Sequence, residues 1–270
     1  MKTIKIMMLT LLMLSINYSQ TKMFINKQSG VDSILLSDIK SITFKTGTMG
    51  SLDSLVAYYP FNGNTKDMSA SGLDITNMGA TLTSDRFSNP NSAYNFDGNT
   101  AYMIIPDSLK KLTFDANSES YSLSMWVNLS AKPSRHIHFI MDRMDVGPWS
   151  YYLNFGVPSS IYYKPYDGGA GGGEFIADSS LSIGVWYHLV AVYSFKNVKL
   201  YLNGNLISSN VLPAGYGSTK RTTKNVLIGA FANSPTAIVD RMIGKIDDIR
   251  IYRKALTSNE IQSLYHEGGW

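Results

Sequence analysis

β-Strand signals recur at short intervals along most of this chain, and this repetition limits the possible folds more than any other feature. From Leu55 to the C-terminus, apolar and β-branched runs alternate with clusters of turn residues. The 17 tyrosines, 11 phenylalanines and 22 glycines suit strands joined by turns. Many short strands with one convincing helix predict an antiparallel sandwich or jelly roll. The clearest runs are Val56–Tyr59, Tyr121–Leu129, Trp186–Tyr193, Val198–Leu202, Leu206–Ser208, Val226–Ala230 and Ile246–Tyr252.

Three local patterns support this interpretation. In Tyr121–Leu129, apolar residues alternate with polar ones and Trp126, which predicts a strand buried on one face only. The dipeptide Asn203–Gly204 stands between two extended runs and predicts a tight hairpin. Near the C-terminus, Thr257–Glu260 has the spacing of a capping box, and Gly268 is a suitable stop for the short helix that follows it.

The first 20 residues have the pattern of a signal peptide. Lys2 and Lys5 precede an apolar run, Ile6–Ile16, that is too short to span a bilayer. We therefore expect cleavage near Gln20 and secretion to the extracellular space or the cell surface. The alternative is a retained anchor helix. No other stretch is long and apolar enough to predict a transmembrane segment in the mature chain.

The rest of the chain divides into a small unit and a large one. Residues 21–47 predict a short β-rich segment, with one strand at Met23–Asn26 and a second extended stretch from Ser33 to Phe44. Residues 48–54 contain Gly, Ser and Thr and predict a linker. Residues 55–270 then form the sandwich.

Composition excludes several classes of function. Hydrophobic residues make up 44% of the chain and charged residues 16%, which is enough for a large core and too little charge for a disordered protein. The formal net charge is only +4, part of it in the leader, so the chain lacks the basic footprint that nucleic acid would need. Cysteine is absent, which excludes disulfides, thiolate metal sites and cysteine nucleophiles.

Several motifs in order resemble the laminin G-like, pentraxin-like jelly rolls of the concanavalin A-like lectin/glucanase fold. The likeness covers residues 53–270 and implies an all-β, antiparallel jelly-roll β-sandwich with one short C-terminal helix. This fold occurs in lectins, adhesion modules and hydrolases, so the resemblance predicts the fold of this chain better than its function. The motifs are Tyr58–Asn64, Asp67–Gly72, Ser92–Gly98, Tyr121–Val127, Trp186–Val190, Leu200–Gly204 and Gly244–Tyr252.

The same resemblance implies a structural Ca²⁺ between the first loop and the last long strand. Strand alternation predicts that Asp247 points inward with Ile249 and Ile251, where an unpaired carboxylate would be costly. Calcium binds several hard oxygen ligands at once. We therefore expect Asn64, Asp67 and Asp247 as ligands. The alternative is that backbone N–H groups or an arginine, Arg86 or Arg241, satisfy Asp247.

An aromatic-rich region between residues 142 and 175 is the candidate for ligand binding. Aromatic rings can cover the apolar faces of sugars, while polar neighbours fix the hydroxyl groups. The Gly-rich loop 168–173 nearby does not match a phosphate-binding pattern. The alternative for any single tyrosine is packing within the sandwich. The expected glycan-binding residues are Asp142, Arg143, Trp149, Tyr163, Tyr166 and Asp167.

Two histidines offer a weaker alternative. His136 and His138 share one strand face and could begin a transition-metal site, although carboxylates from elsewhere would have to complete it.

A catalytic function is disfavoured. The chain has four glutamates, Glu119, Glu174, Glu260 and Glu267, and none lies in a strand pattern like that of the glucanases. We therefore expect a secreted, non-catalytic module whose partner is a glycan. The alternatives are a surface adhesion domain that binds a cell-surface or matrix protein, and a glycoside hydrolase. Oligomers remain open, since pentraxin-like relatives can form rings.

Overall fold

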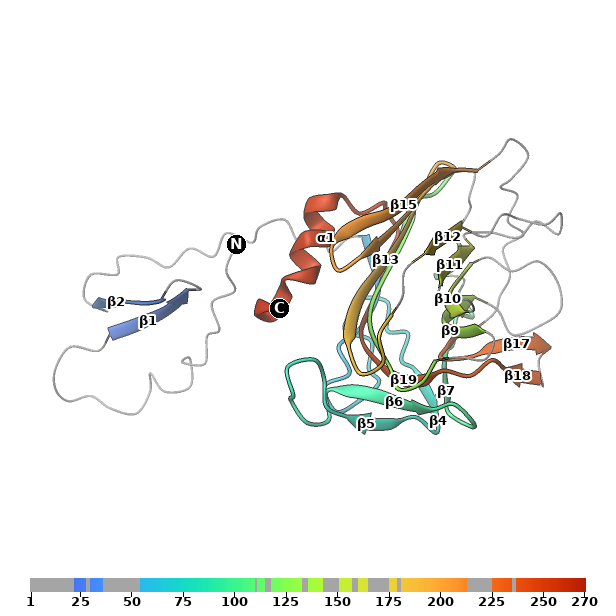
Figure 1. The fold of residues 1–270 in the computed structure, drawn as a ribbon, viewed down its shortest axis with the longest axis horizontal. Helices are drawn as coiled ribbons and strands as arrows, with labels where there is room; N and C mark the ends of the chain where they lie inside the picture. The colour runs from blue at the N-terminus through green and yellow to red at the C-terminus, as the bar shows by residue number, and fades with distance from the viewer. Residues whose placement is uncertain are drawn as a thin grey trace.

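Two antiparallel β-sheets stacked face to face form the body of the protein, and a short helix lies on the outer face of one of them (Figure 1). The structure is a computed structural model that describes residues 22–27, 30–35, 54–109, 111–114, 118–132, 136–142, 151–156, 160–164, 175–178, 181–212, 225–234 and 237–270. The predicted all-β, antiparallel jelly-roll sandwich with one C-terminal helix is confirmed. The predicted signal peptide lies outside the described residues.

Each sheet is assembled from strands far apart in the sequence. In spatial order, the seven-stranded sheet contains β12 (Phe175–Asp178), β11 (Ser160–Lys164), β10 (Tyr152–Gly156), β9 (His136–Asp142), β16 (Val226–Ile228), β7 (Tyr102–Ile105) and β4 (Thr76–Met78). The eight-stranded sheet contains β15 (Asn205–Val211), β14 (Asn197–Leu202), β13 (Trp186–Ser194), β8 (Tyr121–Leu129), β19 (Ile243–Tyr252), β6 (Ala93–Asp97) and β5 (Thr81–Thr83), with β3 (Leu55–Tyr59) also paired to β19.

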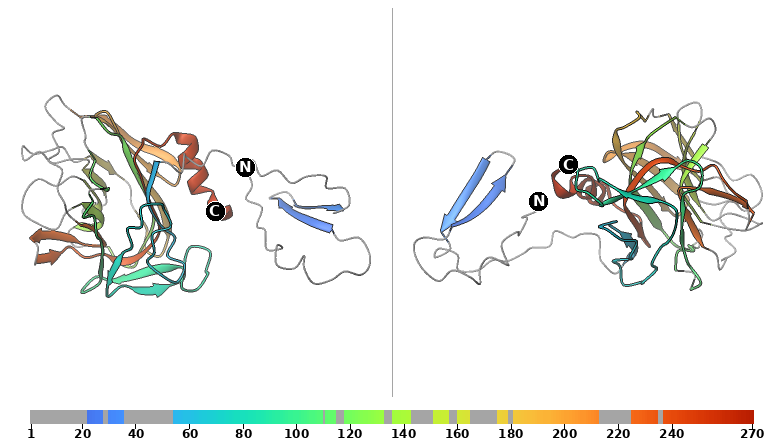
Figure 2. Two further views of the ribbon diagram at one scale, coloured as in Figure 1. Left: turned by 180° about the vertical axis from the view of Figure 1, so that it is seen from behind. Right: turned by 90° about the horizontal axis from the view of Figure 1, so that it is seen from below.

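Two hairpins and the helix complete the described elements. β1 (Lys22–Lys27) pairs with β2 (Gly30–Leu35), so the strand predicted at Met23–Asn26 is present, and the second strand begins earlier than predicted. β17 (Phe231–Ser234) pairs with β18 (Ala237–Val239). Helix α1 (Ser258–Tyr265) precedes a 3₁₀ turn, Glu267–Gly269. Figure 2 shows α1 and the β17–β18 hairpin on opposite sides of the molecule. Within the described ranges, no helix has the length and hydropathy to cross a membrane.

The main core fills the space between the sheets. Leu123 and Met125 of β8 meet Leu153 and Phe155 of β10 in one cluster of buried side chains. Because alternate residues of a strand point to the same face, the residues between them face outward. A second, smaller core lies under α1 and consists of Val190, Val192, Tyr201, Tyr252, Leu256 and Ile261.

β8 is buried on both faces, so the prediction of a half-buried strand is wrong. Its outer-face residues Ser122, Ser124 and Trp126 have no exposed surface. The Ser122 hydroxyl donates to the carbonyl of Lys254 at 2.9 Å, and the Trp126 ring stacks on Tyr265 with centroids 5.8 Å apart. The C-terminal segment therefore covers the side of β8 that alternation alone assigns to solvent.

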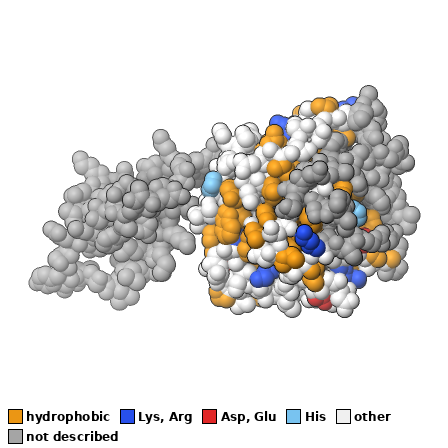
Figure 3. All heavy atoms as spheres, in the orientation of Figure 1, with side chains coloured by type: hydrophobic (Ala, Val, Ile, Leu, Met, Phe, Trp, Pro, Cys, Tyr) orange, Lys and Arg blue, Asp and Glu red, His pale blue; other side chains and the backbone are white. Residues whose placement is uncertain are grey.

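Two other local predictions are confirmed. Asn203 and Gly204 both adopt positive φ, at 50° and 77°, and join β14 to β15 in the expected hairpin. Thr257 and Glu260 form a reciprocal capping box at the start of α1. On the face shown in Figure 3, the Lys and Arg side chains of the described residues are spread among hydrophobic and other polar groups.

Candidate functional site

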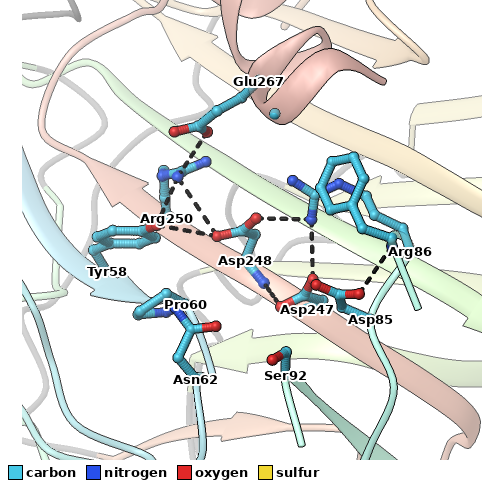
Figure 4. Close-up of a pocket in the computed structure, with 12 residues that line it drawn as sticks. Tyr58, Pro60, Asn62, Asp85, Arg86, Ser92, Asp247, Asp248, Arg250 and Glu267 are labelled. Carbon is cyan, nitrogen blue, oxygen red and sulfur yellow. Dashed lines mark hydrogen bonds and ion pairs between the residues drawn. The ribbon is translucent and has the colours of Figure 1, made fainter. Parts of the chain in front are cut away.

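A charged pocket of about 190 Å³ opens where β3, the β5–β6 loop, β19 and the turn after α1 meet (Figure 4). Four carboxyl groups and two guanidinium groups lie in its wall, and they come from segments that are distant in the sequence. The lining residues are Tyr58, Pro60, Asn62, Asp85, Arg86, Phe87, Ser92, Asp247, Asp248, Arg250, Glu267 and Gly268.

A bulge in β19 turns two neighbouring aspartates toward this pocket. The register with β8 shifts between Asp247 and Arg250, and Asp248 has a φ of +49°. Ile246 and Ile249 remain in the core between the sheets, while Asp247 lies opposite Trp126 on the outer face. The prediction that Asp247 shares the face of Ile249 is therefore wrong, because the extra residue of a bulge reverses the alternation.

Arg86 pairs with both aspartates. Its Nη1 atom lies 2.9 Å from Asp247 Oδ2 and 2.8 Å from Asp248 Oδ2. The side chains of Arg86 and Asp247 are only 4% and 3% exposed. The guanidinium lies over the rings of Phe87 and Trp126, 4.5 Å from each centroid. Arg86 is one of the two arginines that the sequence offered as the alternative partner of Asp247.

Arg250 extends the network to the C-terminus. Its Nη2 atom is 2.8 Å from Glu267 Oε2 and 3.5 Å from Asp248 Oδ1, and it donates to the Tyr58 hydroxyl at 2.8 Å. Burial alone would lower the pKa of Arg250, but Asp248, Tyr58 and Glu267 raise it above its usual range. Burial also raises the pKa of the Tyr58 hydroxyl. Arg250 is therefore charged and Tyr58 neutral at physiological pH.

Asp247 and Asp248 share the Nη1 atom of Arg86, and Arg250 interacts with Asp248. Burial, followed by repulsion from Asp248, raises the pKa of Asp247 above its usual range, and the attraction of Arg86 offsets part of that rise. A carboxyl group with a raised pKa would suit acid–base catalysis. However, both carboxylates are bonded to the same nitrogen atom, and Asp248 is only 12% exposed, which leaves little access for a substrate.

The expected calcium ligands do not come together. Asp67 accepts hydrogen bonds from the N–H groups of Tyr58, Ser69 and Leu73 and from the Ser69 hydroxyl, at 2.8 to 3.0 Å. Asn64 is exposed and accepts from the N–H of Lys66. Asp247 lines the pocket, but Asn64 and Asp67 do not. The structure thus gives the oxygens of these three residues separate hydrogen-bond partners, and calcium binding stays a prediction.

The structure describes only part of the expected glycan-binding set. Arg143, Trp149, Tyr166 and Asp167 lie outside the described residues, as does the side chain of Asp142 at the end of β9. Tyr163 is fully buried in the main core, so it offers no face to a ligand. In β11 it is paired with Leu153, which also points inward. Its neighbour Tyr162 belongs to the outer face.

Of the two histidines of β9, His138 is buried and His136 is half-buried. His138 Nε2 lies 3.0 Å from Asn154 Nδ2, and the Phe231 ring of the β17–β18 hairpin packs at 4.6 Å. Burial, with a smaller contribution from His136, lowers the pKa of His138 to about 3. Among the residues that the structure describes, no group of three His, Asp or Glu side chains could hold a metal ion.

The described glutamates are engaged in the structure. Glu119 pairs with Arg253, and Glu260 both caps α1 and pairs with Lys254. Glu267 pairs with Arg250. These contacts favour structural roles over catalytic ones.

Sequence reasoning missed most of the pocket. Tyr58, Asp248, Arg250 and Glu267 are not adjacent in any pattern that predicts a site. One signal was available: in Ile246-Asp-Asp-Ile249 the core residues are three apart, a spacing that regular alternation does not allow.

A sequence model of the concanavalin A-like lectin/glucanases superfamily matches residues 97–262. The chain belongs to this superfamily. The concanavalin A-like domain extends beyond the matched range, since β3 and β5 precede residue 97 and belong to the same sandwich. No curated protein matches the chain.

Solved structures with the same fold include binding domains. Domain 4 of AbnA, an extracellular arabinanase from Geobacillus stearothermophilus solved with arabinotriose, has a TM-score of 0.61 and 20% identity, over 78% of this chain and 98% of that one. The receptor binding domain of botulinum neurotoxin C/D mosaic serotype has a TM-score of 0.63 and 17% identity, over 80% of this chain and 52% of that one. The binding domain of Paraclostridial Mosquitocidal Protein 1 has a TM-score of 0.62 and 15% identity, over 80% and 52%. This concanavalin A-like domain thus spans about half the length of the two toxin domains.

Proposed function

We propose that this concanavalin A-like domain is a secreted, non-catalytic module that binds carbohydrate. Its ligand surface would include the two chain segments that follow β9 and β11. The leader-like first 20 residues support export. The engagement of the described glutamates in ion pairs and a helix cap supports a binding role over a hydrolytic one.

One observation carries the proposal, namely the register of β9, β10 and β11. Tyr152, the first residue of β10, is paired with Met141 near the end of β9 and with Lys164 at the end of β11. β9 and β11 therefore both end beside the first residue of β10, one on each side of it. Asp142 and Arg143 stand at the first of these ends, and Tyr166 and Asp167 follow the second by a few residues.

The ends of β9 and β11 thus flank the start of β10, and the candidate residues follow these two ends in the sequence. Connections carried by a rigid sandwich are common places for binding residues. Trp149 belongs to the connection between β9 and β10, and an aromatic ring there could cover the apolar face of a sugar.

The structural neighbours support the choice of ligand class. The arabinanase domain was solved with arabinotriose. A further neighbour, at 16% identity and a TM-score of 0.59, comes from work on botulinum neurotoxin type C, whose cell entry depends on interaction with two ganglioside molecules. At these identities the likeness extends to the fold, so the sugar bound by this chain must be found by experiment.

The test is binding of the mature chain to a glycan array that includes arabino-oligosaccharides and ganglioside oligosaccharides. We expect saturable binding to a subset of glycans, reduced at least about tenfold in W149A/Y166A, because stacked aromatic rings dominate such contacts. F195A is a matched control, since Phe195 is an exposed aromatic residue in the β13–β14 turn of the other sheet.

Three outcomes would contradict the proposal. Absence of binding to any glycan, combined with binding to a cell-surface protein, would favour the adhesion alternative. Release of reducing ends from a bound glycan would establish a hydrolase. Equal loss of binding in F195A and W149A/Y166A would show that the ligand surface is not at the ends of β9 and β11.

A further inference from the structure

The resemblance of this chain to laminin G-like domains implies a calcium ion that joins the first loop to the last long strand. In the structure, the guanidinium group of Arg86 contacts the two aspartates of the last long strand, β19. We infer that Arg86 is a built-in counter-ion for Asp247 and Asp248, and that it joins the β5–β6 loop to β19 without a divalent cation.

The carboxylate oxygens of Asp247 and Asp248 are already engaged. Asp247 Oδ1 accepts the N–H of Asp248 at 2.7 Å, and its Oδ2 accepts from Arg86. Asp248 Oδ1 accepts the Tyr58 hydroxyl at 3.1 Å, and its Oδ2 accepts from Arg86. Calcium takes six to eight oxygen ligands, so a calcium ion here would have to displace these donors.

The guanidinium is held in place from several sides. Its side chain is 4% exposed and lies over both Phe87 and Trp126. The loop that carries it is organised by Asp85, whose carboxylate accepts the N–H groups of Phe87 and Asn89 and the side-chain amide of Asn89, at 2.8 to 2.9 Å. The loop and the two rings therefore hold the Arg86 side chain in the position from which it contacts Asp247.

The same arginine also connects the loop with the end of the chain. Asp248 interacts with both Arg86 and Arg250, and Arg250 pairs with Glu267 in the turn after α1. The ring of Phe87 meets the ring of Trp270 edge to face, with centroids 6.0 Å apart. Loop, strand and C-terminal turn thus form one network, in which Arg86 joins the loop to β19 and Arg250 joins β19 to the turn.

Thermal unfolding of the full mature chain tests the inference in EDTA and in excess CaCl₂. We expect the same melting temperature in both. A ligand raises the melting temperature only if it binds the native state, and we infer that this pocket binds no calcium. R86M should melt about 10 °C lower, since removal of one partner leaves buried charge without compensation. R253M is the matched control. Arg253, like Arg86, pairs with a carboxylate, that of Glu119, but its side chain is 33% exposed. Its melting temperature should fall much less.

A double variant separates charge compensation from packing. Among the described residues, Asp247 forms an ion pair with Arg86 only, whereas Asp248 also interacts with Arg250. R86M/D247N removes the guanidinium together with the carboxylate that depends on it. We expect it to melt above R86M, and to fold even if R86M does not.

The inference is overturned by any of three results. The first is a calcium-dependent rise in the wild-type melting temperature that D247N abolishes, because it would assign a metal to the pocket. The second is an R86M melting temperature no lower than that of R253M. The third is a double variant that melts as low as R86M or remains unfolded with it.

Discussion

At the scale of single residues, burial of neutral histidines should make the domain sensitive to acid. His188 is buried, with its Nε2 atom 2.9 Å from Ser124 Oγ. Burial, and then the charges of Arg250 and Arg86, lower the pKa of His188 to about 3. In the unfolded chain histidine takes up a proton near pH 6.5, so protonation favours unfolding as the pH falls from about 6.5 toward 3.

We expect the free energy of unfolding to fall by about 1.4 kcal/mol per pH unit for each such histidine in this range. His138, with a pKa also near 3, adds a second contribution. Urea unfolding between pH 7 and 5 should show a shallower decline for H188Q than for the wild type. Because His266 is exposed, H266Q should retain the wild-type slope. Parallel curves for H188Q and the wild type would contradict this assignment.

Asp67 provides a second residue-scale prediction, which separates a structural carboxylate from a calcium ligand. Its two oxygens hold the loop that follows β3 through three backbone N–H groups and a hydroxyl. D67A should lower the free energy of unfolding by about 2 kcal/mol, in EDTA as much as in calcium. N64A should change it by less than about 0.5 kcal/mol, since Asn64 is exposed. A loss in D67A that appears only when calcium is present would refute the prediction.

At the scale of elements, local patterns were sufficient where neighbouring residues determine the structure. The run Tyr121–Leu129 coincides with β8, and Asn203 with Gly204 forms the expected hairpin. Patterns failed where a distant segment decides burial. Trp126 faces outward from β8 yet is covered by the C-terminal segment, and no feature within β8 encodes that cover.

The candidate site was predicted less completely than the fold. Asp247 was identified, and Arg86 was among its expected partners, but the bulge at Asp248 changed the face on which they meet. The aromatic-rich region predicts Tyr163 as a ligand-binding residue, but its pairing with Leu153 in the register of β11 against β10 turns it into the core. A shift of one residue along a strand moves a side chain from one face of the sheet to the other.

Helix α1 gives the element-scale prediction. The Thr257 side chain accepts the N–H of Glu260, and the helix buries Ile261 over the eight-stranded sheet. T257A should lower the free energy of unfolding by about 1 kcal/mol, the usual cost of losing such a cap. S263A, a substitution on the exposed side of the same helix, should change it by less than about 0.5 kcal/mol. Urea denaturation measures both, and equal effects would argue against a stabilising role for the cap.

At the scale of the whole molecule, β19 is the strand on which the cooperative unit depends. One edge of β19 pairs with β8, and the other edge pairs with β6 and then with β3. The strands up to residue 97 thus complete the eight-stranded sheet on one side of β19. Arg86, in the loop before β6, adds a buried ion pair to the same strand. The sandwich therefore needs more of the chain than the matched range 97–262.

A pair of fragments tests this dependence. Residues 54–270 should unfold in one transition with the urea midpoint of the mature chain, because they contain every strand of both large sheets. Residues 97–270 should show no cooperative transition, since β19 would lose all its partners along one edge and expose the core residues Ile246 and Ile249. Circular dichroism during urea titration measures both fragments. A cooperative 97–270 fragment would mean that β19 is stabilised by β8 alone, and a lower midpoint for 54–270 would mean that residues before 54 contribute to the fold.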